Sequence, residues 1–160
     1  MGPNGKLAAK TAFAWMAADQ LTKILARAFL PLCQVPGPRC VRLGLGEELG
    51  LVRVANGGSA LGFGQGLGVW ILIAVLGLVV VPAYARGRAD PRLALAAGLQ
   101  LGGAAGNLID RLAFGAVTDF LQIGPVVMNL ADLVLLIGTV LGAQVLWRSG
   151  LRTTMEEVKT

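Results

Sequence analysis

The sequence predicts an all-α membrane protein of four transmembrane helices, with a small extracytoplasmic β-cradle between the first and second. Of 160 residues, 55% are hydrophobic and only 14% are charged, whereas average soluble chains have about 25% charged residues. A transmembrane helix needs about 20 mostly apolar residues, and four stretches meet or approach this length. We therefore expect one integral membrane domain over residues 1–160, with helices at about 7–30, 69–85, 93–113 and 126–147.

The four stretches differ in how apolar they are. The second carries no charge, the third is rich in Gly and Ala, and the fourth has a single charge, Asp132, near its start. The first is the poorest, and the charges within it also argue against a cleaved signal peptide. These interrupting residues are Lys10, Asp19, Lys23 and Arg27.

Basic residues at the ends of the apolar stretches predict the orientation. They lie at the N-terminus, between the second and third stretches, and after the fourth, and an even number of crossings places all three regions on one side. Short cytoplasmic loops are enriched in Lys and Arg. Both termini are therefore expected in the cytoplasm, with the loop 33–68 and the connection 113–125 outside. The basic residues are Lys6, Lys10, Arg86, Arg88, Arg92, Arg148, Arg152 and Lys159.

The long outer loop has strand-like and turn-like segments. Leu51, Val52 and Val54 precede a Gly-rich stretch, which is typical of a small β-sheet. Cys33 and Cys40 flank a Pro-Gly-Pro turn. On the oxidising side of a membrane they form a possible disulfide, worth about 2–3 kcal/mol for so short a loop; the alternative is two free thiols.

The composition excludes several kinds of chemistry. The chain has no histidine, which removes a Ser-His-Asp triad and a His-ligated zinc protease. The net charge of +5 does not indicate a nucleic-acid partner, because the basic residues are scattered and aromatic residues are few. Acid–base chemistry must then come from carboxylates or lysine, and we expect no metal and no cofactor.

Polar residues inside apolar stretches are costly and mark functional sites by default. Asp19 and Lys23 are four residues apart and share a helix face, where they either neutralise each other or serve a site. Asn107, Asp110 and Arg111 form one polar face at the outer end of the third stretch, where we expect an Asp110–Arg111 pair to lock the bundle. Small residues at four-residue spacing on the same helix should allow close helix contact; these are Gly98, Gly102 and Gly106.

Two aspartates are expected near the outer membrane surface. Asn129 and Asp132 share a face at the start of the fourth stretch, and Asp119 lies in the connection before it. Two adjacent carboxylates in a poorly solvated site share one proton, so that one acts as base and the other as acid. This suits amide hydrolysis by water. The alternatives are a Ser59–Lys23 protease, a non-enzymatic transporter or proton relay, or, for Asp132, an acid favoured at a helix start.

Asn56 opens the segment NGGSALG, in which two glycines leave the backbone accessible. One asparagine side chain both donates and accepts hydrogen bonds. It is therefore predicted to hold an extended peptide in the site, and the alternative is an ordinary turn residue.

Five short motifs occur in order along these elements, and together they resemble lipoprotein signal peptidase (signal peptidase II), a bacterial intramembrane aspartyl protease. Each motif alone is weak, but five in order across four apolar stretches are specific. They are ADQLTK (18–23), NGGSALG (56–62), GNLIDR (106–111), VTDF (117–120) and NLAD (129–132).

The resemblance implies cleavage of prolipoproteins just before a diacylglyceryl-modified cysteine, near the outer face of the bacterial cytoplasmic membrane. It implies that membrane lipid surrounds the chain and that globomycin-type inhibitors occupy the substrate's place. Asp119 and Asp132 correspond to the catalytic aspartates. The residues that correspond to substrate-binding or site-supporting positions are Asp19, Lys23, Asn56, Gly58, Ala60, Asn107, Asp110, Arg111 and Asn129.

Overall fold

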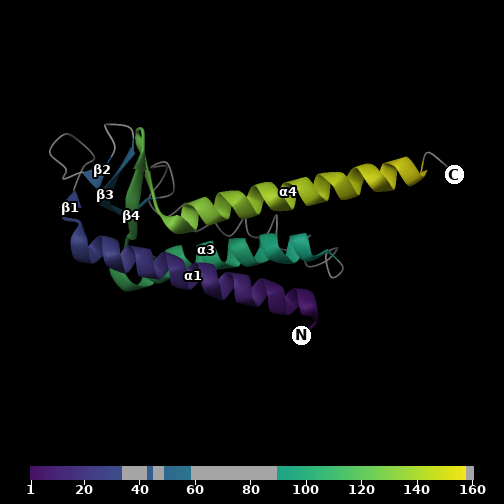
Figure 1. Ribbon diagram of the computed structural model, residues 1–160, viewed down its shortest axis with the longest axis horizontal. Coiled ribbons are helices and arrows are strands. Elements are labelled where there is room, and N and C mark those ends of the chain that lie inside the picture. Colours follow the sequence, from purple (N-terminus) through teal and green to yellow (C-terminus); the bar gives the residue numbers. More distant parts are fainter. Residues whose placement is uncertain (34–42, 45–48, 59–89, 158–160) are drawn as a thin grey trace.

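A computed structural model describes residues 1–33, 43–44, 49–58 and 90–157. Long helices lie side by side, and a β-sheet covers one end of them, while both termini lie toward the opposite end (Figure 1). The helices are α1 (Pro3–Phe29), α3 (Pro91–Phe114) and α4 (Leu130–Glu157). The predicted helix 69–85 lies outside the described residues and stays a prediction, as do expectations for Cys40, Ser59 and Ala60.

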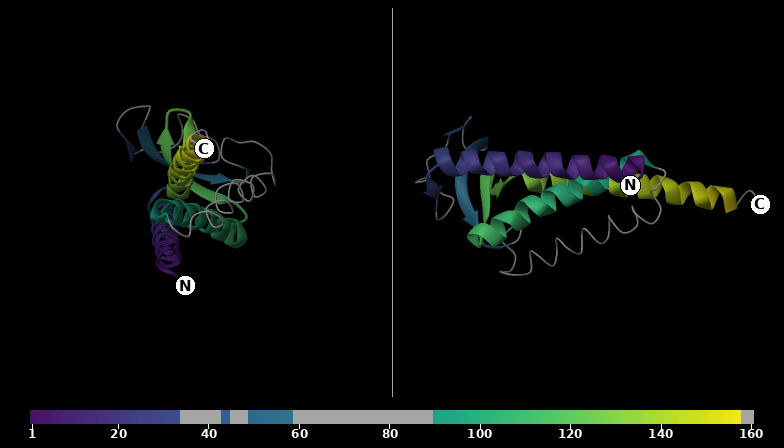
Figure 2. Two further views of the ribbon diagram at one scale, coloured as in Figure 1. Left: turned by 90° about the vertical axis from the view of Figure 1, so that its right-hand side faces the viewer. Right: turned by 90° about the horizontal axis from the view of Figure 1, so that it is seen from below.

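Glycines set the close packing of α3 against its neighbours, as the four-residue spacing predicts. A Cβ atom at Gly98 would lie 2.6 Å from Cβ of Thr11, and one at Gly102 would lie 2.7 Å from the Ala12 carbonyl oxygen. Real Cβ atoms do not approach so closely, so any larger residue would push α1 away from α3. Two further views show α1, α3 and α4 lying side by side, with the C-terminal part of α4 extending beyond the other two (Figure 2).

The ends of α3 follow local chemistry. Asp90 caps the start, where its side chain accepts a hydrogen bond from the Arg92 N–H at 2.8 Å, and Pro91 occupies the first turn. Gly115 ends the helix in the left-handed conformation at φ 72°, which glycine adopts without the steric cost of a Cβ.

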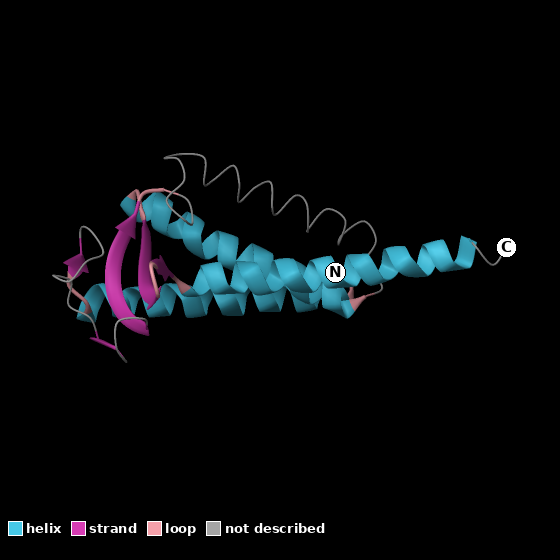
Figure 3. Cartoon of the chain, turned by 90° about the horizontal axis from the view of Figure 1, so that it is seen from above, coloured by secondary structure: helices cyan, strands magenta, loops and turns pink. Residues whose placement is uncertain are grey.

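The sheet is built from segments far apart in the sequence (Figure 3). Its central pair is β3 with β4, which run antiparallel; β1 is parallel to β3, β2 is antiparallel to β3, and β5 is antiparallel to β4. The strands are β1 (Leu32–Cys33), β2 (Leu43–Gly44), β3 (Leu49–Asn56), β4 (Val117–Ile123) and β5 (Val126–Met128). The predicted sheet in the outer loop is therefore correct for β3. Cys33 is disulfide-bonded, but its pairing with Cys40 stays a prediction.

The connection after α3 differs from the prediction. Residues 117–123 are a strand rather than a plain connection, and the stretch expected to begin a helix at residue 126 is first a strand, with α4 beginning at Leu130. Gly124 and Pro125 join β4 to β5 in a two-residue turn, with Gly124 at φ 56°, a position that favours glycine in such hairpins. The hairpin leads the chain from β4 directly to the start of α4.

Polarity is inverted relative to a soluble protein. Large apolar side chains such as Phe13, Leu112 and Leu136 are exposed, whereas charged side chains are buried between the helices. Within the described residues, one segment, Leu130–Ser149 of α4, is long and apolar enough to cross a membrane by length and composition. α1 fails that criterion because of its charges, three of which, Asp19, Lys23 and Arg27, contact α3, β4 or α4, as described next.

Candidate active site

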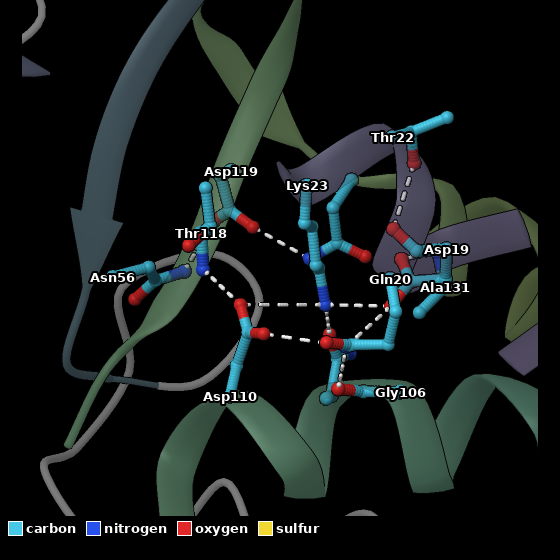
Figure 4. A network of polar contacts seen from close by, with 12 residues as sticks. Asp19, Gln20, Thr22, Lys23, Asn56, Gly106, Asp110, Thr118, Asp119 and Ala131 are labelled. Carbon is cyan, nitrogen blue, oxygen red and sulfur yellow. Dashed lines mark hydrogen bonds and ion pairs between the residues drawn. The ribbon is translucent and has the colours of Figure 1, made fainter. Parts of the chain in front are cut away.

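Polar groups from α1, α3, β3, β4 and the start of α4 meet where the helices join the sheet (Figure 4). Most of them are buried, although their neighbours along each helix are apolar. Buried polar groups need hydrogen-bond partners, and in this cluster those partners come from different elements. The cluster therefore fixes how five segments meet.

Asn129 links the two candidate aspartates. It caps α4, and its Oδ1 accepts from the N–H of Asp132 at 3.1 Å, while Asp132 Oδ2 accepts from the N–H of Asn129 at 3.2 Å. This reciprocal arrangement is a capping box. The Asn129 amide nitrogen also donates to Oδ1 of Asp119 at 2.6 Å. One fully buried side chain thus contacts both aspartates and brings them into one site.

Asp119 lies on β4 opposite Val54 of β3, with 2% of its surface exposed. Asn56, at the end of β3, donates to its Oδ2 at 2.8 Å. Burial raises the pKa of Asp119 to about 6, and the charge of Asp132 adds to this, although hydrogen bonds from Asn56 and Asn129 oppose it. A carboxyl group that exchanges its proton this close to neutral pH is suited to acid–base chemistry.

Asp132 is the more accessible of the two aspartates. Its Oδ1 accepts from the amide nitrogen of Asn107 at 3.0 Å, and its Oδ2 is the capping oxygen. Both of its oxygens are therefore oriented, while the partial exposure leaves room for water or substrate to approach.

The predicted Asp19–Lys23 pair is present. Their charged atoms are 2.9 Å apart, and both side chains are fully buried. Lys23 also donates to Oδ1 of Asn107 at 2.9 Å and lies 3.7 Å from Asp110. Lys23 thus has two close partners and a third at ion-pair distance, so it is engaged in the network rather than available as a base for the alternative with Ser59.

The predicted Asp110–Arg111 pair is wrong. Consecutive helix residues do not face each other, and Asp110 instead contacts Lys23 and Arg27 of α1, the latter at 3.3 Å, and accepts from the Thr118 N–H at 2.8 Å. Arg111 donates to the carbonyl oxygen of Gly58 at 3.2 Å. Asp110 therefore joins α1, α3 and β4, whereas Arg111 holds the segment after β3.

Three further members of the cluster were not predicted: Gln20, Arg27 and Thr118. Gln20 donates to the carbonyl oxygen of Gly106 at 2.9 Å, and Arg27 donates to Thr118 Oγ1 at 2.9 Å. The signal for Arg27 was its spacing, because it follows Asp19 and Lys23 at four-residue intervals and so shares their helix face. Gln20 and Thr118 lie within the motifs ADQLTK and VTDF, which indicate these segments but not these two side chains.

The raised pKa of Asp119 predicts a pH dependence of stability. Because the folded state holds this proton more tightly than the unfolded state does, the stabilisation is complete below about pH 4 and is lost as pH rises through about 6. Asp119→Asn cannot titrate, so its unfolding free energy relative to wild type should rise by at most about 3 kcal/mol across this window. Melting curves of both proteins in detergent at pH 4 to 7 check this, and a constant difference would contradict it.

Among the described residues, no group of three or more His, Cys, Asp or Glu side chains is arranged to hold a metal ion. The site instead contains a pair of carboxylates, Asp119 and Asp132, held by amide and backbone N–H groups. Asp119 is buried from solvent, and Asp132 is partly exposed. Such a pair can hold one proton between its members and transfer it to and from a bound molecule.

Comparisons with known proteins find relatives over most of the chain. The family model of signal peptidase (SPase) II matches residues 11–148. A lipoprotein signal peptidase of Moorella thermoacetica is 38% identical over 135 residues, which are 79% of this chain and 83% of that protein. One of Rhodococcus jostii is 40% identical over 136 residues, covering 79% of this chain and 65% of that protein.

Solved structures show the same fold. A bacterial membrane enzyme determined by the in meso method at 2.3 Å resolution superposes with a TM-score of 0.74 at 24% identity, over 89% of this chain and 88% of that one. A second, at 1.9 Å resolution, gives 0.69 at 25% identity, over 87% and 91%. Peptidase relatives over most of the chain decide against the transporter alternative, and the chain belongs to the signal peptidase II family of membrane peptidases.

Proposed function

We propose that this chain is an aspartyl endopeptidase that removes the signal peptide of prolipoproteins by cleaving before a diacylglyceryl-modified cysteine. The name of its relatives, lipoprotein signal peptidase, gives the substrate class. Asp119 and Asp132 are the proposed catalytic residues. The observation that carries this assignment is Asn129, whose side chain and backbone hold both carboxylates in one site.

In the proposed mechanism, the pair carries one proton when substrate is bound. The ionised aspartate removes a proton from water as the water oxygen attacks the scissile carbonyl carbon. The protonated aspartate gives its proton to the carbonyl oxygen as the tetrahedral intermediate forms. The proton taken from water then passes to the leaving amine nitrogen, and a hydroxyl of the intermediate returns a proton to the aspartate that began as the acid. The amide C–N bond breaks, and the products are a carboxylate and the free amine of the cysteine.

The proposed membrane placement follows from the shape of the molecule. The site lies at the sheet end of the helices, and the two termini lie toward the other end (Figure 1). Basic residues near the termini favour the cytoplasm for that end, so the site faces the outer surface in a multi-pass chain of the cytoplasmic membrane. Exposed apolar side chains on the helices suit contact with lipid, from which a lipid-modified substrate can enter laterally.

The test is cleavage of a defined substrate by the purified chain in detergent and lipid. A prolipoprotein with its diacylglyceryl-modified cysteine should be cut, and mass spectrometry should place the cut immediately before that cysteine. The matched control is the same protein without the lipid. Cleavage elsewhere, or equal cleavage of the unmodified protein, would contradict the proposed specificity.

Asn56→Ala should slow cleavage about 10- to 100-fold, because it removes a hydrogen bond that fixes Asp119 and also the acceptor for the Gly58 N–H. The sequence suggested a role in holding substrate, whereas in the free protein both ends of this amide are already engaged. We therefore expect a fall in kcat rather than a rise in KM. Steady-state kinetics decide between them, and globomycin, the proposed inhibitor, should still bind within a few-fold. A raised KM with weakened globomycin binding would favour direct substrate contact.

A further inference from the structure

All three asparagines of the site point an amide nitrogen at an aspartate. Asn56 and Asn129 donate to Asp119 at 2.8 and 2.6 Å, and Asn107 donates to Asp132 at 3.0 Å. Each amide carries an oxygen on its other side. A flip would turn that oxygen toward a carboxylate, so each amide needs a donor that holds its oxygen in place.

Those donors differ in kind. The oxygens of Asn56 and Asn129 accept from backbone N–H groups at 3.0 and 3.1 Å. The oxygen of Asn107 accepts from Nζ of Lys23 at 2.9 Å. An ammonium group only donates and an ionised carboxylate only accepts, so Asn107 fits between Lys23 and Asp132 in one orientation.

Lys23 is itself held at this position. It is fully buried and paired with Asp19, whose other oxygen accepts from the N–H of Ala131 in the first turn of α4 at 2.9 Å. The pair therefore joins α1 to the same helix end that carries Asp132. Lys23 does not contact either candidate catalytic aspartate through any hydrogen bond or ion pair found among the described residues.

We propose that Lys23 is a positioning residue for Asp132 that acts through Asn107, by fixing the amide so that its nitrogen faces the carboxylate. This rests on the proposed function of Asp132. With Lys23 absent, the Asn107 amide is free to rotate, and Asp132 loses the donor that orients its Oδ1. The expected defect lies in the chemical step rather than in substrate binding.

A double-mutant cycle tests this. Lys23→Met alone would leave Asp19 buried without its partner, so the variant used is Asp19→Asn/Lys23→Met, which removes both charges and keeps an oxygen for the Ala131 N–H. This variant and Asn107→Leu should each lower kcat roughly 10- to 100-fold with little change in KM. The protein that carries both changes should have the kcat of the slower variant, within about threefold. The reason is that both variants interrupt the same contacts, from Lys23 through Asn107 to Asp132.

The matched control is Gln100→Leu. Gln100 lies two turns before Asn107 on α3, is fully buried, and donates to the Leu135 carbonyl oxygen of α4 at 2.9 Å. Its loss removes a comparable helix contact away from the aspartates, so its effect on kcat should be small and should multiply with that of Asp19→Asn/Lys23→Met. The positioning role would be overturned if the kcat losses of Asn107→Leu and Asp19→Asn/Lys23→Met also multiplied when combined. It would equally be overturned if Asp19→Asn/Lys23→Met kept the wild-type kcat.

Asn107→Asp provides a second test if Asp19→Asn/Lys23→Met folds poorly. This nearly isosteric change preserves the acceptor for Lys23 but replaces the donor to Asp132 with an oxygen. We expect a fall in kcat of at least about 10-fold in protein that still folds, as checked by thermal melting; wild-type kcat would overturn the inference. Failure of wild type itself to cleave a lipid-modified prolipoprotein would instead overturn the proposed function.

Discussion

Asp119→Asn and Asp132→Asn should each lower the single-turnover cleavage rate by about 10³-fold or more while the protein still folds. Asparagine preserves the shape of the side chain but cannot take up or release the catalytic proton, and a positioned acid or base contributes about 10²- to 10⁴-fold. Each aspartate has oriented hydrogen-bond donors that do not depend on the other. The measurement is the single-turnover rate on a lipid-modified prolipoprotein, with folding checked by thermal melting.

Ser59→Ala is the control for the alternative nucleophile. It should leave turnover within a few-fold of wild type, because Lys23 is committed to Asp19, Asn107 and Asp110 and cannot serve as the base for a serine. If Ser59→Ala were inactive and a variant of either aspartate were active, Ser59 rather than the aspartates would be the catalytic residue.

Asp110→Asn should destabilise the protein by about 3 kcal/mol, because breaking one side of a buried charge network leaves the remaining charges uncompensated. Asp110 is fully buried, contacts Lys23 and Arg27, and accepts from the Thr118 N–H. For a chain of this size, the loss corresponds to a fall in Tm of about 6–12 °C. Activity per folded molecule should stay within a few-fold of wild type.

The matched control on the same helix is Asp90→Asn. Asp90 caps α3 through a hydrogen bond to the Arg92 N–H, and asparagine caps a helix about as well as aspartate. Its Tm should therefore change little. An Asp110→Asn protein with unchanged Tm and no activity would show that Asp110 acts in the chemistry rather than in the packing.

Much of the fold is predictable from local patterns. Apolar runs indicated α1, α3 and α4, glycine spacing indicated their close packing, and β-branched residues indicated β3. The strands β4 and β5 were missed because a short apolar run such as 126–128 fits a strand or a helix equally well. The signals that separate them were present: the Gly124–Pro125 turn favours a hairpin, and Asn129 three residues before an acid favours a helix start.

The sequence predicted which residues belong to the site, but not which of them contact one another. Ionisable residues in apolar stretches identified Asp19, Lys23 and Asp110, because their burial requires a reason. Which of them pair across helices depends on packing, and contacts such as Lys23 to Asn107 join residues 84 positions apart. For this reason Asp110 was predicted to pair with Arg111, its neighbour in the sequence, whereas its partners lie on α1 and β4.

The central claim is that Asp119 and Asp132 act as one catalytic unit, and the Asp119→Asn/Asp132→Asn double variant tests it most directly. Groups that work together give losses that do not multiply. The single-turnover rate of the double variant on a lipid-modified prolipoprotein should equal that of the slower single variant within about threefold. A double variant slower by the product of the two single losses, or a single variant that retains more than about a tenth of the wild-type rate, would contradict it.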